Sequence, residues 1–468
     1  MSGEQLVLAC ELVFLVYVVT GTLGYLFLNL VALAHVSRYL PTRALEQFPR
    51  QFSGLEPPIS ILAPAYNEET TITASIRSLL QLHYTEHDVI VINDGSTDRT
   101  LEVLIGEFGL MPVPEAYDAR LPMKPIRAIY GSARYPSLRV IDKENGGKAD
   151  ALNAGINLSR NPLFCCIDAD SVLERDSLYR VVQPFLEDPH TVACGGTIRI
   201  ANGCDIRGGF LAQVGLPTNG LALFQTVEYL RAFLFGRMGW SPMNAMLVIS
   251  GAFGLFRRDT VVEAGGYRRE TIGEDMDLVV RLHRHLRLQE RPYRIAYIPD
   301  PVCWTEAPED IPTLRAQRIR WQRGLSESLT HHWDLLCHPR GGAVGWIAFP
   351  FMVLWEWLGP LFEFIGCLFL VTGALLGVVS LPLAAAFASL SIVFGVLLSV
   401  TALLLEELTF HVYPKSRQVL LQYLVAIAEN FGYRQLISWW RLIGLVRWLR
   451  GEQASWGKMT RWGSWQTP

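Results

Sequence analysis

Two aspartates, Asp168 and Asp170, follow an apolar run and are well suited to hold a metal ion. The run is Leu-Phe-Cys-Cys-Ile at 163–167, so we expect a strand to end where the acids begin. Alternate carboxylates can converge on one hard cation, and Mg²⁺ or Mn²⁺ completes its shell with phosphate oxygens and water. The same acids, with Ser171, also suit the N-cap of a helix expected over 174–186. Both interpretations stand at this point.

A second acidic pair, Glu274 and Asp275, follows Gly273 and opens a segment with helical apolar spacing. Acids at a helix start are stabilised by the helix dipole, which gives them a purely structural explanation. The functional interpretation is that one of the two is a general base facing a cleft. A sugar hydroxyl is a poor nucleophile until a carboxylate takes its proton as the new bond forms.

Residues 317–321, Gln-Arg-Ile-Arg-Trp, place an amide, two cations and an indole on about one and a half helical turns. Arg suits a diphosphate, and Trp offers a face on which a sugar ring can stack. Some twenty residues later the chain becomes apolar for about 65 residues. An interfacial helix, with Arg at lipid headgroups and Trp in the aromatic belt, fits the same residues. The carboxylates upstream favour the catalytic interpretation.

Two loops have the composition of a nucleotide site. Residues 64–68, Pro-Ala-Tyr-Asn-Glu, and Asp94 can form a base pocket in which Tyr66 stacks and Asp94 accepts a hydrogen bond. The turn Glu-Asn-Gly-Gly-Lys at 144–148 opens a helix, so its amides and Lys148 can hold phosphate oxygens. Ordinary loop structure is the alternative for both. The sequence has neither GxGxxG nor GxxxxGK[ST], so no dinucleotide or P-loop pattern is supported.

Short apolar strands that alternate with helices must position these groups. We expect strands at 59–65, 88–94, 138–142 and 163–168, and helices at 69–82, 97–107 and 147–158. This alternation, with β-branched runs, predicts a largely parallel sheet covered on both faces. In such sheets the ligand lies at the carboxyl ends of the strands. The polar residues at 67–68, 94–96 and 168–170 each follow a strand, as that rule requires.

Bulk composition points to a membrane protein. The chain has 468 residues, of which 50% are hydrophobic, and its net charge of −3 gives no basic field for nucleic acid. Residues 12–34 carry no charge, which is long enough to span a bilayer, and no cleavage signal follows. Arg38, Arg43 and Arg50 come next, so we expect the N-terminus outside and the following domain in the cytoplasm. The eight Cys show no metal-ligand spacing.

We therefore expect five segments along the chain. These are an N-terminal transmembrane helix at 1–36, a cytoplasmic α/β domain at 37–310, an interfacial helix at 311–340, transmembrane helices at 341–435 and a cytoplasmic, amphipathic, Trp-rich tail at 436–468. Pro360 is expected to break the first of the later helices. Arginines after 433 favour a cytoplasmic C-terminus, and hence two or four crossings after the α/β domain. The expected location is the inner (plasma) membrane, multi-pass.

With these residues assembled, the chain resembles family 2 glycosyltransferases of the membrane-embedded polysaccharide-synthase type, which include cellulose, chitin-oligosaccharide, hyaluronan and poly-N-acetylglucosamine synthases. The resemblance covers about residues 59–325 and rests on APAYNE, VINDGS, GGKADALN, CIDAD (a DxD motif), SGAFGLFRR, GED and QRIRW (a QxxRW motif) in that order. It implies a Rossmann-like GT-A fold with a mainly parallel sheet, a nucleotide sugar, usually a UDP-sugar, and an inverting displacement assisted by Mg²⁺ or Mn²⁺.

The resemblance also implies roles for individual residues. Those implied to bind the nucleotide sugar are Pro64, Tyr66, Glu68, Asp94, Lys148, Asp168, Gln317 and Arg320. Asp170 is implied to coordinate the metal directly, beside Asp168. Asp275 is implied to be the catalytic base, with Glu274 next to it. Those implied to line the acceptor site are Ser250, Gly251, Phe253 and Trp321.

We expect a processive synthase that extends a β-linked polysaccharide and passes it through its own helices. We expect membrane lipids around it and no nucleic acid. Whether export subunits assemble with it is left undecided by the sequence. A single transfer to a membrane lipid, of the ceramide, sterol or polyprenyl type, is the alternative. A sugar-binding transporter without activity fits less well, because the motif set argues for catalysis. A nucleotidyltransferase on the same broad fold gives residues 317–321 no role.

Two further features leave questions open. Cellulose synthases usually have Thr where this chain has Gly273, which leans toward the chitin and hyaluronan types and leaves the sugar undecided. The segment 456–462, Trp-Gly-Lys-Met-Thr-Arg-Trp, is too polar to span a bilayer. We expect it either to fold back over the donor site as a gate or to anchor the chain at the membrane interface.

Overall fold

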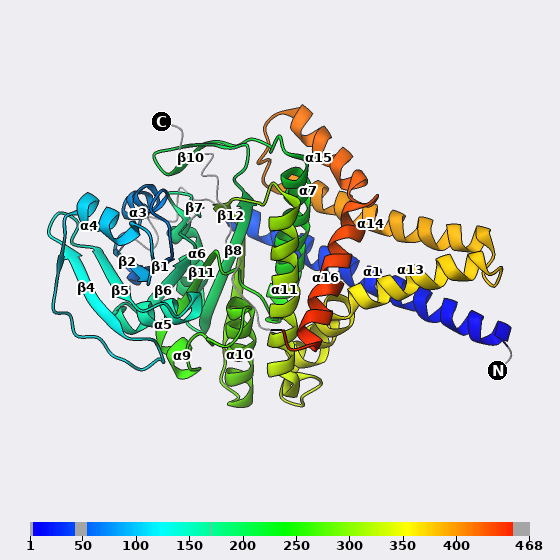
Figure 1. The fold of residues 1–468 in the computed structure, drawn as a ribbon, viewed down its shortest axis with the longest axis horizontal. Coiled ribbons are helices and arrows are strands. Elements are labelled where there is room, and N and C mark those ends of the chain that lie inside the picture. Colours follow the sequence, from blue (N-terminus) through cyan, green and yellow to red (C-terminus); the bar gives the residue numbers. More distant parts are fainter. Residues whose placement is uncertain (1–2, 43–53, 170, 453–468) are drawn as a thin grey trace.

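The computed structural model describes residues 3–42, 54–169 and 171–452. An α/β domain lies at one end, and three apolar helices extend together from the other (Figure 1). These apolar helices are α1 (Gly3–Thr42), α13 (Gly359–Leu375) and α14 (Leu381–Thr409). Asp170 and the segment 456–462 lie outside the described residues. The metal ligand expected at Asp170, and the gate or interfacial anchor expected at 456–462, therefore stay predictions.

A ten-stranded sheet organises the α/β domain, in the order β3-β4-β5-β2-β1-β6-β11-β8-β12-β7. The central strands β5, β2, β1 and β6 are parallel, as the sequence predicts. β11 runs antiparallel to both of its neighbours, which makes the sheet mixed. The strands are β1 (Ile59–Ala65), β2 (His87–Asp94), β3 (Leu110–Pro112), β4 (Ile126–Ser132), β5 (Leu138–Lys143), β6 (Leu163–Ile167), β7 (Val172–Leu173), β8 (Thr191–Ile200), β11 (Phe253–Arg257), β12 (Arg294–Thr305) and, in a separate ribbon, β9 (Asp205–Arg207) and β10 (Phe210–Gln213).

The sheet is buried on both faces, which confirms the layered arrangement expected from the sequence. Along β1, Ile59 and Ile61 pack with α3, α4 and α6, whereas Leu62 packs on the other face with α5 and α10. The covering helices are α3 (Ile72–Leu80), α4 (Thr100–Phe108), α5 (Lys148–Leu158), α6 (Ser177–Glu187), α9 (Arg258–Glu263) and α10 (Glu274–Leu288).

The chain after Asp168 excludes one of the two interpretations of that residue. Strand β7 follows almost at once and pairs with β12. Helix α6 then begins only at Ser177, with Asp176 as its N-cap residue. Because strand pairing displaces the start of the helix, the helix-capping interpretation of Asp168 and Ser171 is wrong. Asp168 lies just after the end of β6, and ligands of such α/β domains bind at the carboxyl ends of the strands.

Within residues 3–42, 54–169 and 171–452, two helices are long and apolar enough to cross a membrane, namely Gln5–Tyr39 within α1 and Leu381–Thr409. A third crossing results if the bent pair Val344–Trp357 and Gly359–Leu375, which meet at 45°, forms one span. Pro360 lies in the first turn of α13, so the break falls where the sequence predicts it. In the described part of the chain, this leaves at most two such crossings after the α/β domain.

A layer of helices separates the sheet from the apolar helices. Helix α11 carries residues 317–321, and α16 packs along it (Figure 1). Helix α16 runs across the boundary expected between 435 and 436. The remaining elements are α7 (Gly220–Tyr229), the π-helical η1 (Leu230–Arg237), α8 (Met238–Trp240), η2 (Ser241–Met243), α11 (Ile311–His331), η3 (Trp333–Leu335), η4 (Val344–Ala348), α12 (Phe349–Phe351), η5 (Met352–Trp357), α15 (Ser416–Ala428) and α16 (Tyr433–Leu449).

Buried polar contacts tie the α/β domain to the apolar helices. Arg199, at the end of β8, donates to Glu406 of α14 at 2.6 Å, and both side chains are almost fully buried. Tyr39 of α1 donates to Asp300 of β12. A buried charge that loses its partner is strongly destabilising. These contacts therefore hold the α/β domain firmly on the apolar helices.

His283 of α10 makes the stability of the α/β domain depend on pH. Its ring is fully buried, with Nδ1 2.6 Å from the Tyr293 hydroxyl and Nε2 2.9 Å from the Met246 carbonyl oxygen. Burial lowers the pKa of His283 from 6.5 to about 4. A lowered pKa means that the stabilising contribution is complete above pH 6.5 and is lost as the pH falls through about 4.

We expect the midpoint of thermal unfolding to fall between about pH 7.5 and about pH 5, and to fall less in His283→Gln. The amide of Gln can replace both hydrogen bonds but cannot take up a proton. Thermal unfolding of the purified protein in detergent at the two pH values measures the difference. An equal fall in both proteins would show that other groups dominate the pH dependence.

Candidate active site

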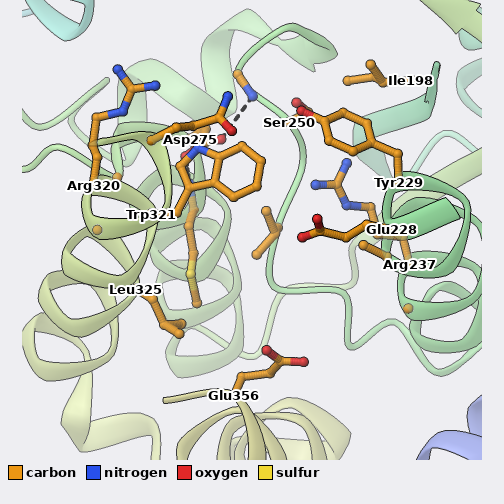
Figure 2. A pocket seen from close by; sticks show the side chains of 18 of the residues that line it. Ile198, Glu228, Tyr229, Arg237, Ser250, Asp275, Arg320, Trp321, Leu325 and Glu356 are labelled. Carbon is orange, nitrogen blue, oxygen red and sulfur yellow. Dashed lines mark hydrogen bonds between the residues drawn. The ribbon is translucent and has the colours of Figure 1, made fainter. Parts of the chain in front are cut away.

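A cavity of about 1640 Å³ begins at the carboxyl ends of the parallel strands, and Figure 2 shows the part of it around Trp321. Because β1, β2 and β6 are neighbours, the residues that follow them reach the same edge of the sheet. The cavity also meets the start of α10 and one face of α11. The expected residues that line it are Pro64, Tyr66, Glu68, Asp94, Lys148, Asp168, Ser250, Gly251, Glu274, Asp275, Gln317, Arg320 and Trp321.

Asp94 organises the turn that precedes α5. Its carboxylate accepts hydrogen bonds from the backbone N–H groups of Gly146, at 3.0 Å, and Gly147, at 2.7 Å. It also pairs with Lys143 at 2.6 Å, and Lys143 pairs with Asp150 at 2.7 Å. The Lys143 and Asp150 side chains are fully buried. Asp94 therefore shapes the backbone against which a nucleotide would lie. Asp150 lies in the motif GGKADALN, whereas Lys143 belongs to none of the motifs.

Lys148 joins three parts of the site. Its ammonium donates to Asp168 and to the Gly251 carbonyl oxygen at 3.0 Å, and it lies 3.9 Å from Glu274. Burial alone would lower the pKa of Lys148, but the charges of Asp168 and Glu274 raise it well above its usual value. Lys148 is therefore a fixed cation in the cavity, a suitable partner for phosphate oxygens.

The two acids at the start of α10 differ in their surroundings. Glu274 is buried, and burial raises its pKa to about 7, with Lys148 opposing and Asp275 adding to the rise. Asp275 is only partly buried and lines the cavity beside Trp321 (Figure 2). Asp275 Oδ2 accepts from the Gly251 N–H at 2.9 Å, and Oδ1 accepts from the Met276 N–H at 2.8 Å. Asp275 thus has both an oriented carboxylate and access to the cavity.

Gly273 lies where α10 and α11 touch through their backbones. A Cβ atom built on Gly273 would lie 2.8 Å from the Gly324 Cα, and one built on Gly324 would lie 2.9 Å from the Gly273 Cα. Real Cβ atoms do not approach backbone so closely. The contact therefore explains why this chain has Gly, and not the larger Thr, before its acidic pair, and it sets the distance between Asp275 and the face of α11 that carries Trp321.

We expect Gly273→Ala to destabilise the protein by about 1–3 kcal/mol, because the added methyl must push two backbones apart. Gly106→Ala is the matched control, since Gly106 lies in a helix and a Cβ there would meet nothing within 4 Å. That change should be neutral or stabilise by about 0.4–1 kcal/mol. Thermal unfolding of both variants tests the contact. Equal stabilities would mean that α10 and α11 can separate without cost.

Residues 317–321 divide between two faces of α11. Gln317, Arg320 and Trp321 are spaced i, i+3 and i+4 and all line the cavity. Gln317 is 8% exposed, and its Oε1 has no hydrogen-bond partner among the residues that the structure describes. A buried polar atom of this kind points to a ligand. Arg318 and Ile319 turn instead into the protein and are buried.

The loop after β1 forms the rim of the cavity. Asn67 has a φ of 56°, and its Oδ1 accepts from the Thr97 N–H at 2.8 Å, which ties this loop to the one after β2. Glu68 is buried and accepts from the Thr71 hydroxyl at 2.8 Å. Tyr66 is half exposed. Its ring is therefore available for stacking at the mouth of the cavity, whereas Glu68 also supports the loop.

Phe253 differs from the expectation that it lines the acceptor site. Its side chain is fully buried in the sheet core and is not part of the cavity lining. The reason is alternation along β11, which turns Phe253 inward, while Ser250 and Gly251 precede the strand and reach the cavity. Three further lining residues, Glu228, Tyr229 and Arg237, come from α7 and η1 (Figure 2). No motif in the sequence indicated them.

Asp168 is the described residue that could ligate a metal ion in this cavity. No group of three or more His, Cys, Asp or Glu placed to hold a metal ion occurs among the described residues, which do not include Asp170. Asp168 lines the cavity next to Lys148 with about a third of its side chain exposed. Mg²⁺ or Mn²⁺ on a diphosphate needs only one or two protein carboxylates. The residues present therefore fit such an ion.

The cavity continues past Trp321 toward the apolar helices. Glu356 of η5 lies at that end (Figure 2), where it accepts from the Tyr25 hydroxyl and pairs with Arg441 of α16 at 3.2 Å. Tyr17, Asn29 and Trp355 also line this part. One continuous space thus joins the strand ends to a polar-lined gap beside α1 and α14.

Comparison with known families places this arrangement. Residues 60–107 match glycosyl transferase family 2, and residues 163–402, half of the chain, match glycosyl transferase family group 2. The chain belongs to glycosyl transferase family group 2. The second match takes in Asp168, Asp275 and residues 317–321, which are among the positions on which the resemblance was based.

Relatives of this glycosyl transferase include two poly-β-1,6-N-acetyl-D-glucosamine synthases. That of Staphylococcus aureus (strain COL) is 32% identical over 274 residues, which is 58% of this chain and 55% of the relative. That of Staphylococcus epidermidis is 31% identical over 272 residues, with the same shares. The chain thus spans about half the length of the curated relatives it matches. A mannosyltransferase structure from Pyrobaculum calidifontis, in complex with GDP-Man and Mn²⁺, superposes on this chain with a TM-score of 0.50 and 18% identity. The similarity covers 87% of this chain and 99% of the mannosyltransferase. The GT-A fold is thereby confirmed.

Proposed function

We propose that this protein transfers a sugar, with inversion, from a UDP-sugar to a growing β-linked polysaccharide at the inner membrane. The observation that carries the proposal is the continuous cavity from the strand ends past Trp321 to the apolar helices. The two poly-β-1,6-N-acetyl-D-glucosamine synthases support a polysaccharide product and suggest N-acetylglucosamine as the first sugar to test. The positive-inside pattern of the sequence supports a cytoplasmic α/β domain.

The donor half of the proposal uses the strand-end residues. Tyr66, Glu68 and Asp94 hold the nucleoside, and Asp168 and Asp170 are the residues that would hold Mg²⁺ or Mn²⁺. The bound cation supplies charge neutralisation on the departing diphosphate. Gln317 and Arg320 add hydrogen bonds to the same leaving group. These hydrogen bonds strengthen as the negative charge on the diphosphate grows. The ammonium of Lys148, which stays charged beside Asp168, adds a further positive charge near the diphosphate.

The acceptor half uses Asp275 and Trp321. The acceptor ring stacks on Trp321, with its hydroxyl directed at the Asp275 carboxylate, which takes the proton as the anomeric carbon is attacked. One displacement inverts that carbon, so an α-linked donor gives a β-linked product. The hydrogen bonds to Asp275 from the Gly251 and Met276 N–H groups orient its carboxylate. After transfer the growing polysaccharide advances toward Glu356 and the apolar helices.

A donor screen tests this proposal. The purified protein in lipid vesicles would be given UDP-N-acetylglucosamine and other radiolabelled UDP-sugars with Mg²⁺ or Mn²⁺. We expect UDP release with one sugar and a ladder of high-mass product. A single sugar on an extractable lipid would replace the synthase by a lipid glycosyltransferase, and no transfer from any donor would overturn the proposal.

A further inference from the structure

Arg318 lies inside the motif at 317–321 but faces away from the cavity that the motif lines. It is 2% exposed, and its Nη2 donates to Glu228 Oε2 at 3.0 Å. Its guanidinium carbon lies 4.3 Å from the centroid of the Trp321 ring. An arginine over an aromatic face is attracted by the ring, and the attraction is strongest when the pair is shielded from water. Arg318 therefore covers the protein side of the indole.

The cavity side of Trp321 is open by comparison. The residue is 42% exposed and lines the cavity, with Tyr229 at a ring-centroid distance of 6.4 Å and a tilt of 48°. A sugar ring stacks on an aromatic face only if that face is held at a defined angle. The contact with Arg318 on one side leaves a single face for the acceptor.

Glu228 and Tyr433 in turn fix Arg318. The Glu228 Oε2 atom that accepts from Arg318 also accepts from the Tyr433 hydroxyl at 2.8 Å. The Tyr433 ring stacks on Phe224, with centroids 4.8 Å apart and planes 17° apart. These contacts join α7, α11 and α16 behind Trp321. These contacts hold the Arg318 guanidinium in one orientation, because they prevent rotation about the bonds of its side chain.

We propose that Arg318 is a positioning residue that sets the plane of Trp321, and that Glu228 and Tyr433 hold Arg318 in place. This inference rests on the proposed function, in which Trp321 receives the acceptor. It predicts that loss of Arg318 weakens use of the acceptor and leaves use of the donor unchanged, because Gln317 and Arg320 lie on the other face of α11.

The test removes both charges together, so that no unpaired charge stays buried. In the variant with Arg318→Met and Glu228→Gln, we expect the KM for a short β-1,6-linked N-acetylglucosamine oligosaccharide to rise about tenfold. The KM for UDP-N-acetylglucosamine should stay within about twofold. Arg207→Met with Asp205→Asn is the matched control, because that ion pair is exposed on the β9 ribbon. Tyr433→Phe keeps the stack on Phe224 and should give a smaller rise of the same kind.

A double-mutant cycle with Trp321→Leu identifies the route of the effect. If Arg318 acts through Trp321, removing its charge in the Trp321→Leu background changes the acceptor KM no further. A full effect in that background, or an equal rise of both KM values, would overturn the inference. If the wild-type protein transfers sugar but the charge-free variant keeps its acceptor KM, this inference fails alone. If the wild-type protein transfers nothing, the proposed function fails with it.

Discussion

Asp275→Asn is expected to lower the turnover of sugar transfer on the order of 10³-fold while UDP binds with nearly unchanged affinity. The amide keeps the size of the side chain and can still accept from the Gly251 N–H, so the local structure survives. It cannot take a proton from the acceptor hydroxyl, so the bond-forming step loses its base. Turnover measured by UDP release, with UDP binding measured by calorimetry, separates the two effects.

Asp259→Asn is the control for this change. Asp259 lies on α9 with a side chain that is 75% exposed, so the same loss of charge should leave turnover unaltered. If Asp275→Asn turned over at the wild-type rate, another group would have to take the proton, and Glu274, its buried neighbour with a raised pKa, would be examined next.

Lys143→Met is expected to produce the largest loss of stability, about 3–5 kcal/mol. Lys143 is fully buried between Asp94 and Asp150, and the substitution leaves two carboxylates in the interior without their shared cation. Arg269 still pairs with Asp150, but Asp94 then depends on the backbone of the turn alone. We also expect UDP affinity to fall, because Asp94 no longer fixes the Gly-Gly turn before Lys148.

The measurement for this variant is the midpoint of thermal unfolding in detergent, which should fall on the order of 10 °C. Lys124→Met is the matched control. The Lys124 side chain is exposed, and only its backbone N–H contacts Asp150, so its loss should change stability by about 0.5 kcal/mol or less. A variant of Lys143 as stable as the control would mean that the buried carboxylates take up protons at little cost.

The parallel core and the position of the site could be predicted because both depend on local pattern. Apolar strands followed by polar residues identify the carboxyl edge of a parallel sheet, and Asp94 and Asp168 follow that rule in the structure. The faces of α11 are likewise fixed by helical spacing, which brings Gln317, Arg320 and Trp321 to the same cavity.

Other features depend on contacts between distant segments, which one sequence does not reveal. Lys143 belongs to no motif, and its burial follows from the pairing of β2 with β5, which sets it beside Asp94. The role of Gly273 requires knowledge of Gly324. Residues 230–237 carry none of the motifs, and the structure has a π-helix there that sets Arg237 at the cavity.

The ion pair between Arg199 and Glu406 has a consequence for how the enzyme is made in the cell. Arg199 belongs to the sheet and Glu406 to a helix that follows more than two hundred residues later, close to the end of the described chain. During synthesis Arg199 therefore lacks its partner until α14 has been made. We expect the α/β domain to reach its final stability only then, so that a chain which stops before α14 carries a less stable α/β domain.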